Sequence, residues 1–229
     1  CWFVWMDKGL TNECVQRMLQ LWPLPSNLPA RTAADFCLGF ARLNKNAARE
    51  EHWEAACRAE ALYRRLGDTD ALSQALLLVA VIGALRDSMS EAERALREAE
   101  ELITDTVPLS RQAWLAGTQG ECYLRHGSPG LAIAVFRWQA ELCRRAGEVT
   151  GGNMALGNLG CAQLDAGDLD AAIESLRKAV DGLRKFTGPG YGLELRLSTL
   201  AVALAWRGDD VDILPLAREA FDQLHLLGV

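Results

Sequence analysis

The sequence of 229 residues lacks a long apolar run and an excess of positive charge. Its longest apolar stretches, residues 75–85 and 1–6, are shorter than the roughly 20 residues that a membrane-spanning helix needs. Asp and Glu number 30 against 24 Lys and Arg, so the formal net charge is −6. An acidic chain does not favour binding to a phosphate backbone. We therefore expect no membrane span and no direct nucleic-acid contact by this segment.

The sequence also lacks the residue spacing that zinc sites need. Its seven cysteines are scattered without a C-x-x-C pair, and its three histidines are far apart. Zinc ligands usually come in closely spaced pairs, so we predict no metal site. Scattered cysteines in a helical chain indicate reduced thiols and a cytoplasmic protein. Because the chain has no initiator Met and no signal-peptide pattern, we interpret it as a fragment of a longer protein.

Catalytic motifs are absent as well. The sequence contains no G-x-S-x-G, no G-x-x-x-x-G-K-[ST] and no H-E-x-x-H. Glu50, Glu51 and His52 have acid–base side chains but no partner pattern, and we interpret them as a solvated helix face. The glycine-rich segment 188–192 follows a helix pattern, which favours an inter-repeat turn over a phosphate-binding loop. We therefore predict that the protein is not an enzyme.

What the sequence does contain is a repeat of about forty residues. Small anchor residues recur at this period, and they are Ala80, Gly120, Gly160 and Ala201. An alanine and then a large apolar residue follow the first three anchors, namely Ala92 and Leu96, Ala132 and Phe136, and Ala172 and Leu176. Apolar residues at helical spacing predict two helices per unit, and no alternation typical of strands is sustained. The predicted fold class is all-α.

The small residues have a packing role in this template. A small side chain at the anchor lets the second helix of the pair approach, and the larger residues fill the gap to the next pair. One pair cannot bury its apolar face alone, so stacked pairs share a core. We predict that the structural repeat positions are Ala80, Gly120, Tyr123, Ala132, Phe136, Leu159, Gly160, Ala172 and Leu176.

Capping signals mark the helix ends. Ser88 and Glu91 have the spacing of a capping box, Ser128 precedes a proline, and Asp168 precedes an apolar run. A basic segment closed by Gly147 is typical of a helix C-terminus.

Two of the units resemble the tetratricopeptide repeat (TPR). Its pattern W-x₂-L-G-x₂-Y…A-x₃-F is matched at Leu156, Leu159, Gly160, Ala172 and Leu176, and again at Gly120, Tyr123, Ala132 and Phe136. The resemblance implies a right-handed superhelical solenoid of about six antiparallel helix pairs in a single domain, 1–229. The expected pairs are 1–28 (truncated), 29–68, 69–107, 108–148, 149–189 and 190–229.

A second resemblance is more specific. The Trp-rich opening at 1–5, the R-R-L-G-D closure at 64–68 and the N-L-G start at 158–160 are similar to the helical-repeat sensor region of bacterial STAND-type ATPase transcriptional regulators. This resemblance implies a non-enzymatic sensor or interaction module of a cytosolic bacterial regulator. It implies no cofactor in this segment, with ATP bound by an upstream domain of the parent protein.

The family resemblance also implies where a partner binds, because the first helix of each pair lines the concave surface of such solenoids. The groove candidates are Trp114, Glu121, Leu124, Arg125, Met154, Leu164, Asp165 and Trp206. A groove with tryptophan and few charges suits a helix, an extended peptide or a stacked sugar-like ligand, and it does not suit a C-terminal carboxylate. The expected partner is a protein or peptide, including the upstream switch domain of the same protein, or a small effector.

Three alternatives stay open at this point. Tight coiling would bury these residues inside the solenoid. The module would otherwise be a receptor for a small-molecule inducer, or a free-standing scaffold unrelated to transcription. The sequence leaves the oligomeric state open.

Overall fold

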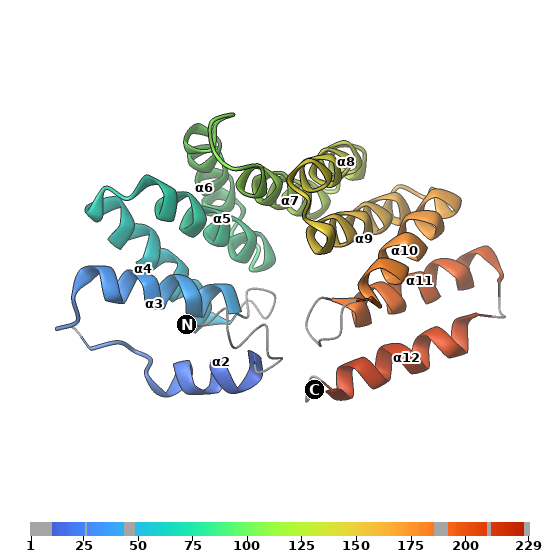
Figure 1. Ribbon diagram of the computed structural model, residues 1–229, viewed down its shortest axis with the longest axis horizontal. Coiled ribbons are helices and arrows are strands. Elements are labelled where there is room, and N and C mark those ends of the chain that lie inside the picture. Colours follow the sequence, from blue (N-terminus) through green and yellow to red (C-terminus); the bar gives the residue numbers. More distant parts are fainter. Residues whose placement is uncertain (1–10, 26, 44–48, 186–191, 210–211, 227–229) are drawn as a thin grey trace. The chain divides into compact units, whose positions relative to one another are not determined.

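The computed structural model describes residues 11–25, 27–43, 49–185, 192–209 and 212–226 (Figure 1). These residues form eleven α-helices and no β-strand, which confirms the all-α prediction. The helices are α2 (Thr11–Gln20), α3 (Ala30–Leu43), α4 (Glu50–Leu66), α5 (Thr69–Leu85), α6 (Met89–Leu102), α7 (Leu109–Arg125), α8 (Pro129–Ala146), α9 (Val149–Asp165), α10 (Leu169–Leu183), α11 (Leu193–Arg207) and α12 (Ile213–Leu226). The Trp-rich opening and residues 188–191 lie outside the described residues.

The chain divides into two compact units, residues 1–125 (unit 1) and 126–229 (unit 2). In unit 1, α3 packs against α4 and α5 against α6; in unit 2, α9 packs against α10 and α11 against α12. Helices α5, α7 and α9 begin at Thr69, Leu109 and Val149, so the forty-residue period is present in the structure. The grouping of all pairs into one domain stays a prediction.

Helix α5 is the centre of unit 1 and is apolar on all sides. It packs against α3, α4, α6 and α7, so each of its faces meets another helix. Its consecutive leucines Leu76, Leu77 and Leu78 are all buried. A helix that is apolar all round is stable only when other elements surround it. The longest apolar stretch of the sequence is therefore a core helix of unit 1.

The anchor Gly160 is a point of close approach between α9 and α10. A Cβ atom at this position would lie 2.6 Å from Leu176 Cγ and 3.2 Å from the carbonyl oxygen of Ala172. Both of those residues are fully buried on α10. Only a residue without a side chain fits between the two helices. Among the other structural repeat positions, Tyr123 is half-buried, and the buried ones are Ala80, Gly120, Ala132, Phe136 and Leu159.

Two of the predicted helix ends have the expected hydrogen bonds or backbone. The Asp168 carboxylate accepts a hydrogen bond from the backbone N–H of Ala171 (3.2 Å) at the start of α10. Gly147 ends α8 in the left-handed conformation, with φ 71°, which a glycine adopts without a steric penalty. Asp168 therefore caps the start of α10 and Gly147 the end of α8, as expected for their residue types.

The predicted serine caps are different. The side chains of Ser88 and Ser128 accept no hydrogen bond from the helices that follow them. Glu91 is bound instead by the hydroxyl of Ser90, at 2.6 Å, so the predicted capping box does not form. At both serines ψ is near 60° instead of extended, and the short hydroxyl group then does not reach a backbone N–H of the helix. The side chain of Asp168 is one atom longer, and it does reach one.

The turn between the helices of a unit keeps one backbone conformation even where its residue changes. Gly127, Gly167 and Gly208 have φ of 67°, 80° and 84°, and Asp87 at the equivalent place has φ 58°. A left-handed backbone costs a residue with a Cβ about 1–2 kcal/mol, and aspartate is among the residues that adopt it most often.

The structure corrects the interpretation of His52. Its side chain is fully buried in unit 1, with its ring 4.6 Å from that of Phe40, and neither ring nitrogen has a hydrogen-bond partner among the described residues. Glu50 is exposed and Glu51 is half-buried. His52 turns inward because α3 covers this face of α4, which a one-helix pattern does not show.

Replacing Gly160 by alanine should destabilise unit 2, whereas the same replacement at Gly152 should not. The methyl group at 160 collides with Leu176 and a backbone oxygen, and overpacking of this kind costs about 1–3 kcal/mol. At Gly152 the nearest atom to a new Cβ is Cys143 Cβ at 3.8 Å, and alanine stabilises a helix by up to about 1 kcal/mol relative to glycine. Chemical denaturation measures both variants, and a wild-type curve for Gly160→Ala would contradict the close approach.

The stability of unit 1 should fall as the pH falls below about 6.5, the ordinary pKa of histidine. Burial lowers the pKa of His52 in the folded chain, so the unfolded chain binds the proton more tightly and protonation favours unfolding. This loss is absent above the unfolded pKa and grows as the pH falls towards the folded one. His52→Leu removes both unpaired nitrogens and should flatten the decline.

Melting temperatures of wild type and His52→Leu at about pH 7.5 and about pH 5, on either side of the ordinary value, check this expectation. Equal declines in the two proteins would show that His52 is not the residue responsible.

Candidate functional site

Trp114 is the predicted groove residue around which unit 1 places two arginines. It is half-buried on α7 and packs against the core of unit 1. The guanidinium carbon of Arg42, from α3, lies 4.4 Å from the centre of its ring, and that of Arg111 lies 5.9 Å from it. Contacts within about 6 Å of a ring centre are cation–π interactions. Helices α3 and α7 of unit 1 thus meet at an aromatic ring that contacts two cations.

Polar contacts hold together a group that we call the Trp114 cluster, formed by Arg42, Gln74, Arg111 and Trp114. Arg111 donates from Nη1 to the Ser73 hydroxyl (3.0 Å), and its Nη2 lies 3.2 Å from the Asp70 carboxylate. Arg42 Nη1 lies 3.5 Å from the Gln74 amide oxygen. Burial, and then the positive charge of Arg111, lower the pKa of Arg42. The cluster combines an aromatic face with positive charge from first helices of three pairs.

The other predicted residues of α7 lie further along the helix. Glu121 and Leu124 are half-buried, and Arg125 is exposed at the helix end. They follow Trp114 by two to three turns, which is about 10 Å or more at 1.5 Å per residue. Unit 1 therefore does not bring them into the Trp114 cluster.

In unit 2, the predicted residue Trp206 belongs to an exposed apolar stripe on α11. Leu195, Val202 and Trp206 are 53%, 44% and 65% exposed. Their spacing of seven and four residues places them on one face of the helix, and we call them the α11 stripe. Met154 on α9, also predicted, is 39% exposed. Exposed apolar residues that lie side by side on one face are typical of interaction surfaces.

Beside the stripe, Arg196 is buried between α11 and α9. Its side chain is only 8% exposed. It donates from Nη2 to the Asn158 amide oxygen, and its Nη1 lies 3.4 Å from Cys161 Sγ. The guanidinium rests on Gly157, where a Cβ atom would collide with Nε.

The family's groove positions also fall on Leu195 and Val202, at helical spacing to Trp206, so sequence reasoning reached the α11 stripe. It missed the arginines. Arg42 and Arg196 carry no such signal, because a single arginine in an amphipathic helix has the pattern of a solvated residue.

The two predicted residues at the end of α9 lie in different environments. Asp165 is exposed. Leu164 is 8% exposed and belongs to the core of unit 2, together with Leu200 and Leu204. It follows Met154 by ten residues, and at about 100° per residue this turns it away from the exposed face. Leu164 is therefore a core residue and not part of a binding surface.

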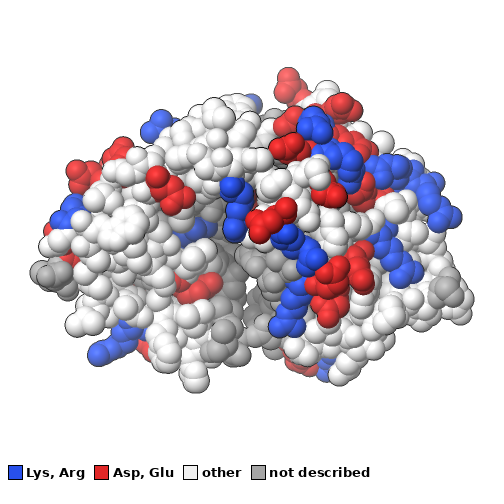
Figure 2. All heavy atoms as spheres, turned by 180° about the vertical axis from the view of Figure 1, so that it is seen from behind, with Lys and Arg blue, Asp and Glu red and all other residues white. Residues whose placement is uncertain are grey.

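The second helices of the pairs in unit 1 carry paired charges instead of apolar groups. Arg94 of α6 binds Glu60 of α4 through hydrogen bonds of 2.9 and 3.0 Å. Arg64 of α4 binds Glu98 of α6 through two hydrogen bonds of 2.7 Å. Figure 2 shows side chains of both signs alternating over unit 1, in the right half of the view. These charges satisfy one another, which indicates that this face links the helix pairs of unit 1.

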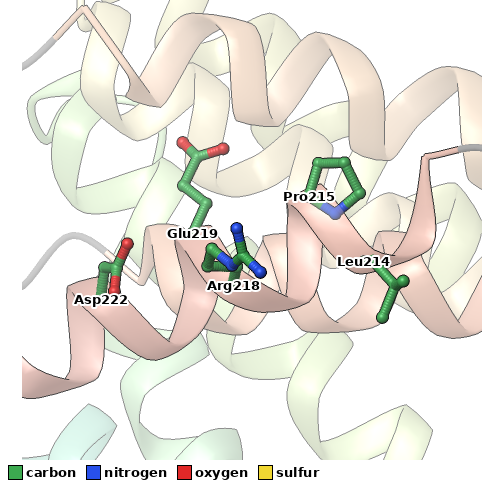
Figure 3. Close-up of a pocket in the computed structure, with 5 residues that line it drawn as sticks. All are labelled: Leu214, Pro215, Arg218, Glu219 and Asp222. Carbon is green, nitrogen blue, oxygen red and sulfur yellow. The ribbon is translucent and has the colours of Figure 1, made fainter.

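A pocket of about 380 Å³ lies on α12 (Figure 3), and it is lined by Leu214, Pro215, Arg218, Glu219 and Asp222. Glu219 points towards a neighbouring helix, and Arg184, directly after α10, donates to it at 2.9 Å, whereas Leu214 points away from that helix. All five residues come from one helix, so the pocket has no second wall. Ligand sites usually enclose most of their ligand, and this pocket does not.

The thiols of the described residues are free, and four of them are buried, namely Cys14, Cys37, Cys122 and Cys143. Burial raises the pKa of Cys37, Cys57 and Cys122 to about 11, so these thiols are protonated at neutral pH and are poor nucleophiles. Within the described ranges, no three His, Cys, Asp or Glu residues gather as a metal site would need. In the same part of the chain, no helix has both the length and the apolar character to cross a membrane.

No protein-family model matches the chain, and no curated protein matches it in sequence. Solved structures do match. The Rap protein complexed with Competence and Sporulation Factor is similar over 99% of this chain, with a TM-score of 0.77 at 14% identity. BtubC from P. vanneervenii has a TM-score of 0.66 at 15% identity and covers 97% of this chain and 91% of its own.

The putative kinesin light chain of Podosopora anserina, which has TPR-like repeats, has a TM-score of 0.59 at 15% identity and covers 88% of this chain and 97% of its own. These similarities show a TPR-like helical-repeat fold and confirm the fold that the repeat pattern predicts. This chain spans 62% of the length of the Rap chain. At such identities the similarities establish the fold alone.

Proposed function

We propose that the chain is a protein-interaction module that binds an apolar segment of a peptide or protein on the surface formed by α9 and α11. The observation that carries this proposal is the α11 stripe together with Met154. Tryptophan is enriched among the residues that dominate binding energy at interfaces, and Trp206 is 65% exposed. An apolar stripe of this kind gains free energy when a partner removes it from water.

The core of unit 2 does not need the α11 stripe. Leu197, Leu200 and Leu204 on the same helix are buried and supply its contacts with the core. The stripe residues lie on the opposite side of the helix and remain exposed. A large aromatic side chain in that position contributes little to folding, so its role lies in contact with a partner.

The Trp114 cluster in unit 1 supports the same class of function. An aromatic ring beside two guanidinium groups is suited to aromatic and acidic side chains of a partner. It lies on first helices of the pairs, as the α11 stripe does. The paired charges of the second helices in unit 1 do not offer such contacts.

The fold also supports the proposal. Stacked helix pairs create extended surfaces that helical-repeat proteins use for binding. The Rap protein, which is similar in fold, is complexed with Competence and Sporulation Factor.

The sequence resemblance to STAND-type regulators extends the proposal. In this form the module is the sensor arm of a cytoplasmic bacterial transcriptional regulator, and it binds an effector or a segment of the regulator's own switch domain. The segment works without a cofactor or catalysis, and ATP is bound upstream. Such a partner changes the state of a switch only if it binds the two states with different affinities.

Peptides selected from a random-sequence display library against the wild-type chain should depend on Trp206. For these peptides, Trp206→Ala should weaken binding at least about tenfold, the loss typical of a residue that dominates an interface. Fluorescence polarisation with labelled peptides measures the affinities. The melting temperature should stay unchanged, because Trp206 is exposed.

Trp138→Ala is the matched control. Trp138 is 49% exposed on α8, outside the surface of α9 and α11, and its replacement should leave affinity unchanged. Equal losses in the two variants, or a library that contains no binder, would count against this surface as the binding site.

A further inference from the structure

We propose that Arg196 is an anion anchor of the surface formed by α9 and α11, and that it pairs with the carboxylate of an Asp or Glu side chain in the bound peptide. This inference rests on the proposed function and names the chemistry of the ligand.

Arg196 differs from other arginines of unit 2 in what it contacts. Arg184 lies 2.9 Å from the Glu219 carboxylate, and Arg207 lies 3.2 Å from the Asp170 carboxylate. Arg196 is the buried arginine of the described residues, yet none of their carboxylates lies within 4.0 Å of it. Its contacts are a neutral amide oxygen and a thiol.

A buried guanidinium with only neutral neighbours lacks an opposite charge and some of its hydrogen-bond partners. Removing a cation from water is costly unless an opposite charge and hydrogen bonds replace the water. A guanidinium has five N–H donors in a planar fork, and Asn158 and Cys161 occupy only part of that fork. A carboxylate binds such a fork through two parallel hydrogen bonds. The missing partner is therefore of a definite chemical kind.

The guanidinium reaches the face of α9 that a partner would contact. Asn158 and Cys161 follow Met154 by four and seven residues, so all three share one face of the helix. Met154 is exposed on this face. Gly157 at its edge leaves the space in which the guanidinium lies. Arg196 therefore extends from α11 to Asn158 and Cys161, on the face of α9 that carries Met154.

The apolar residues around Arg196 favour an acidic side chain within a peptide over a chain terminus. Leu195 precedes Arg196 on α11, and Val202 and Trp206 follow it. A carboxylate at Arg196 would thus have apolar residues of α11 before and after it along the helix. A glutamate or aspartate with apolar neighbours on both sides in the peptide matches this order. A carboxylate at a chain terminus has a neighbour on one side only and would leave part of the apolar surface uncovered.

The test uses peptides with amidated C-termini, selected against the wild-type chain from a random-sequence library. Selected peptides should carry an acidic residue flanked by apolar ones. Changing that residue from Glu to Gln should weaken binding to wild type at least about tenfold, as loss of a charge-assisted pair does. The Glu and Gln peptides should bind Arg196→Gln with equal affinity. This double-mutant cycle isolates the pairwise interaction.

Two further variants separate binding from folding. Gly157→Ala keeps the charge but displaces the guanidinium, and it should reduce the discrimination between the Glu and Gln peptides. Arg207→Gln is the matched control, because Arg207 already has carboxylate partners, and it should keep the discrimination. Added salt should weaken binding of the Glu peptide more than that of the Gln peptide.

Equal affinity of wild type for both peptides would overturn the proposal while leaving the proposed function intact. Arg196→Gln lowering both affinities by the same factor would also overturn it, because Arg196 would then act through the structure only. Absence of any Trp206-dependent binder would overturn the proposed function and this inference with it.

Discussion

Close approach of helices at residues without side chains is the constraint on which unit 2 depends. Gly160 on α9 leaves room for Leu176 of α10, and a single added carbon would collide with that side chain and with a backbone oxygen. Glycine within a helix costs about 1 kcal/mol relative to alanine, so the sequence keeps it only where the gain from packing is larger. The forty-residue repeat returns a small residue to this place in each unit, and the fold follows from that regularity.

The same device also shapes the binding surface. Gly157, one turn before Gly160, receives the guanidinium of Arg196 instead of an apolar side chain. The first contact joins the two helices of a pair, and the second joins first helices of neighbouring pairs. Two glycines one turn apart on α9 therefore let the helix pack closely against α10 at Gly160 and hold a cation from α11 at Gly157. Structure and binding chemistry in unit 2 use one local feature of α9.

The sequence predicted the structure well where the residue pattern of one helix indicates which of its faces is buried. The spacing of Gly160, Ala172 and Leu176 predicted the helix pairs, and the forty-residue period is present in the starts of α5, α7 and α9. The sequence did not predict the burial of a residue that is covered by a different helix. His52 is buried because α3 covers it, and Arg196 is buried because Gly157 accommodates it. Of the candidate site, Trp114, Met154 and Trp206 could be predicted, whereas Arg42 and Arg196 could not.

Natural sequences are consistent at most levels, and they depart from local rules mainly at functional sites. Unit 2 shows two such departures. One is a line of large apolar side chains exposed on α11, and the other is a buried cation without an opposite charge among the described residues. Each of these two features raises the free energy of the protein when no partner is bound. Both occur where α11 meets α9, and one ligand with an acidic residue between apolar ones would relieve them together. That coincidence is why the surface of α9 and α11 is a stronger candidate than the pocket on α12, where Glu219 already pairs with Arg184, and Arg218 and Asp222 are exposed.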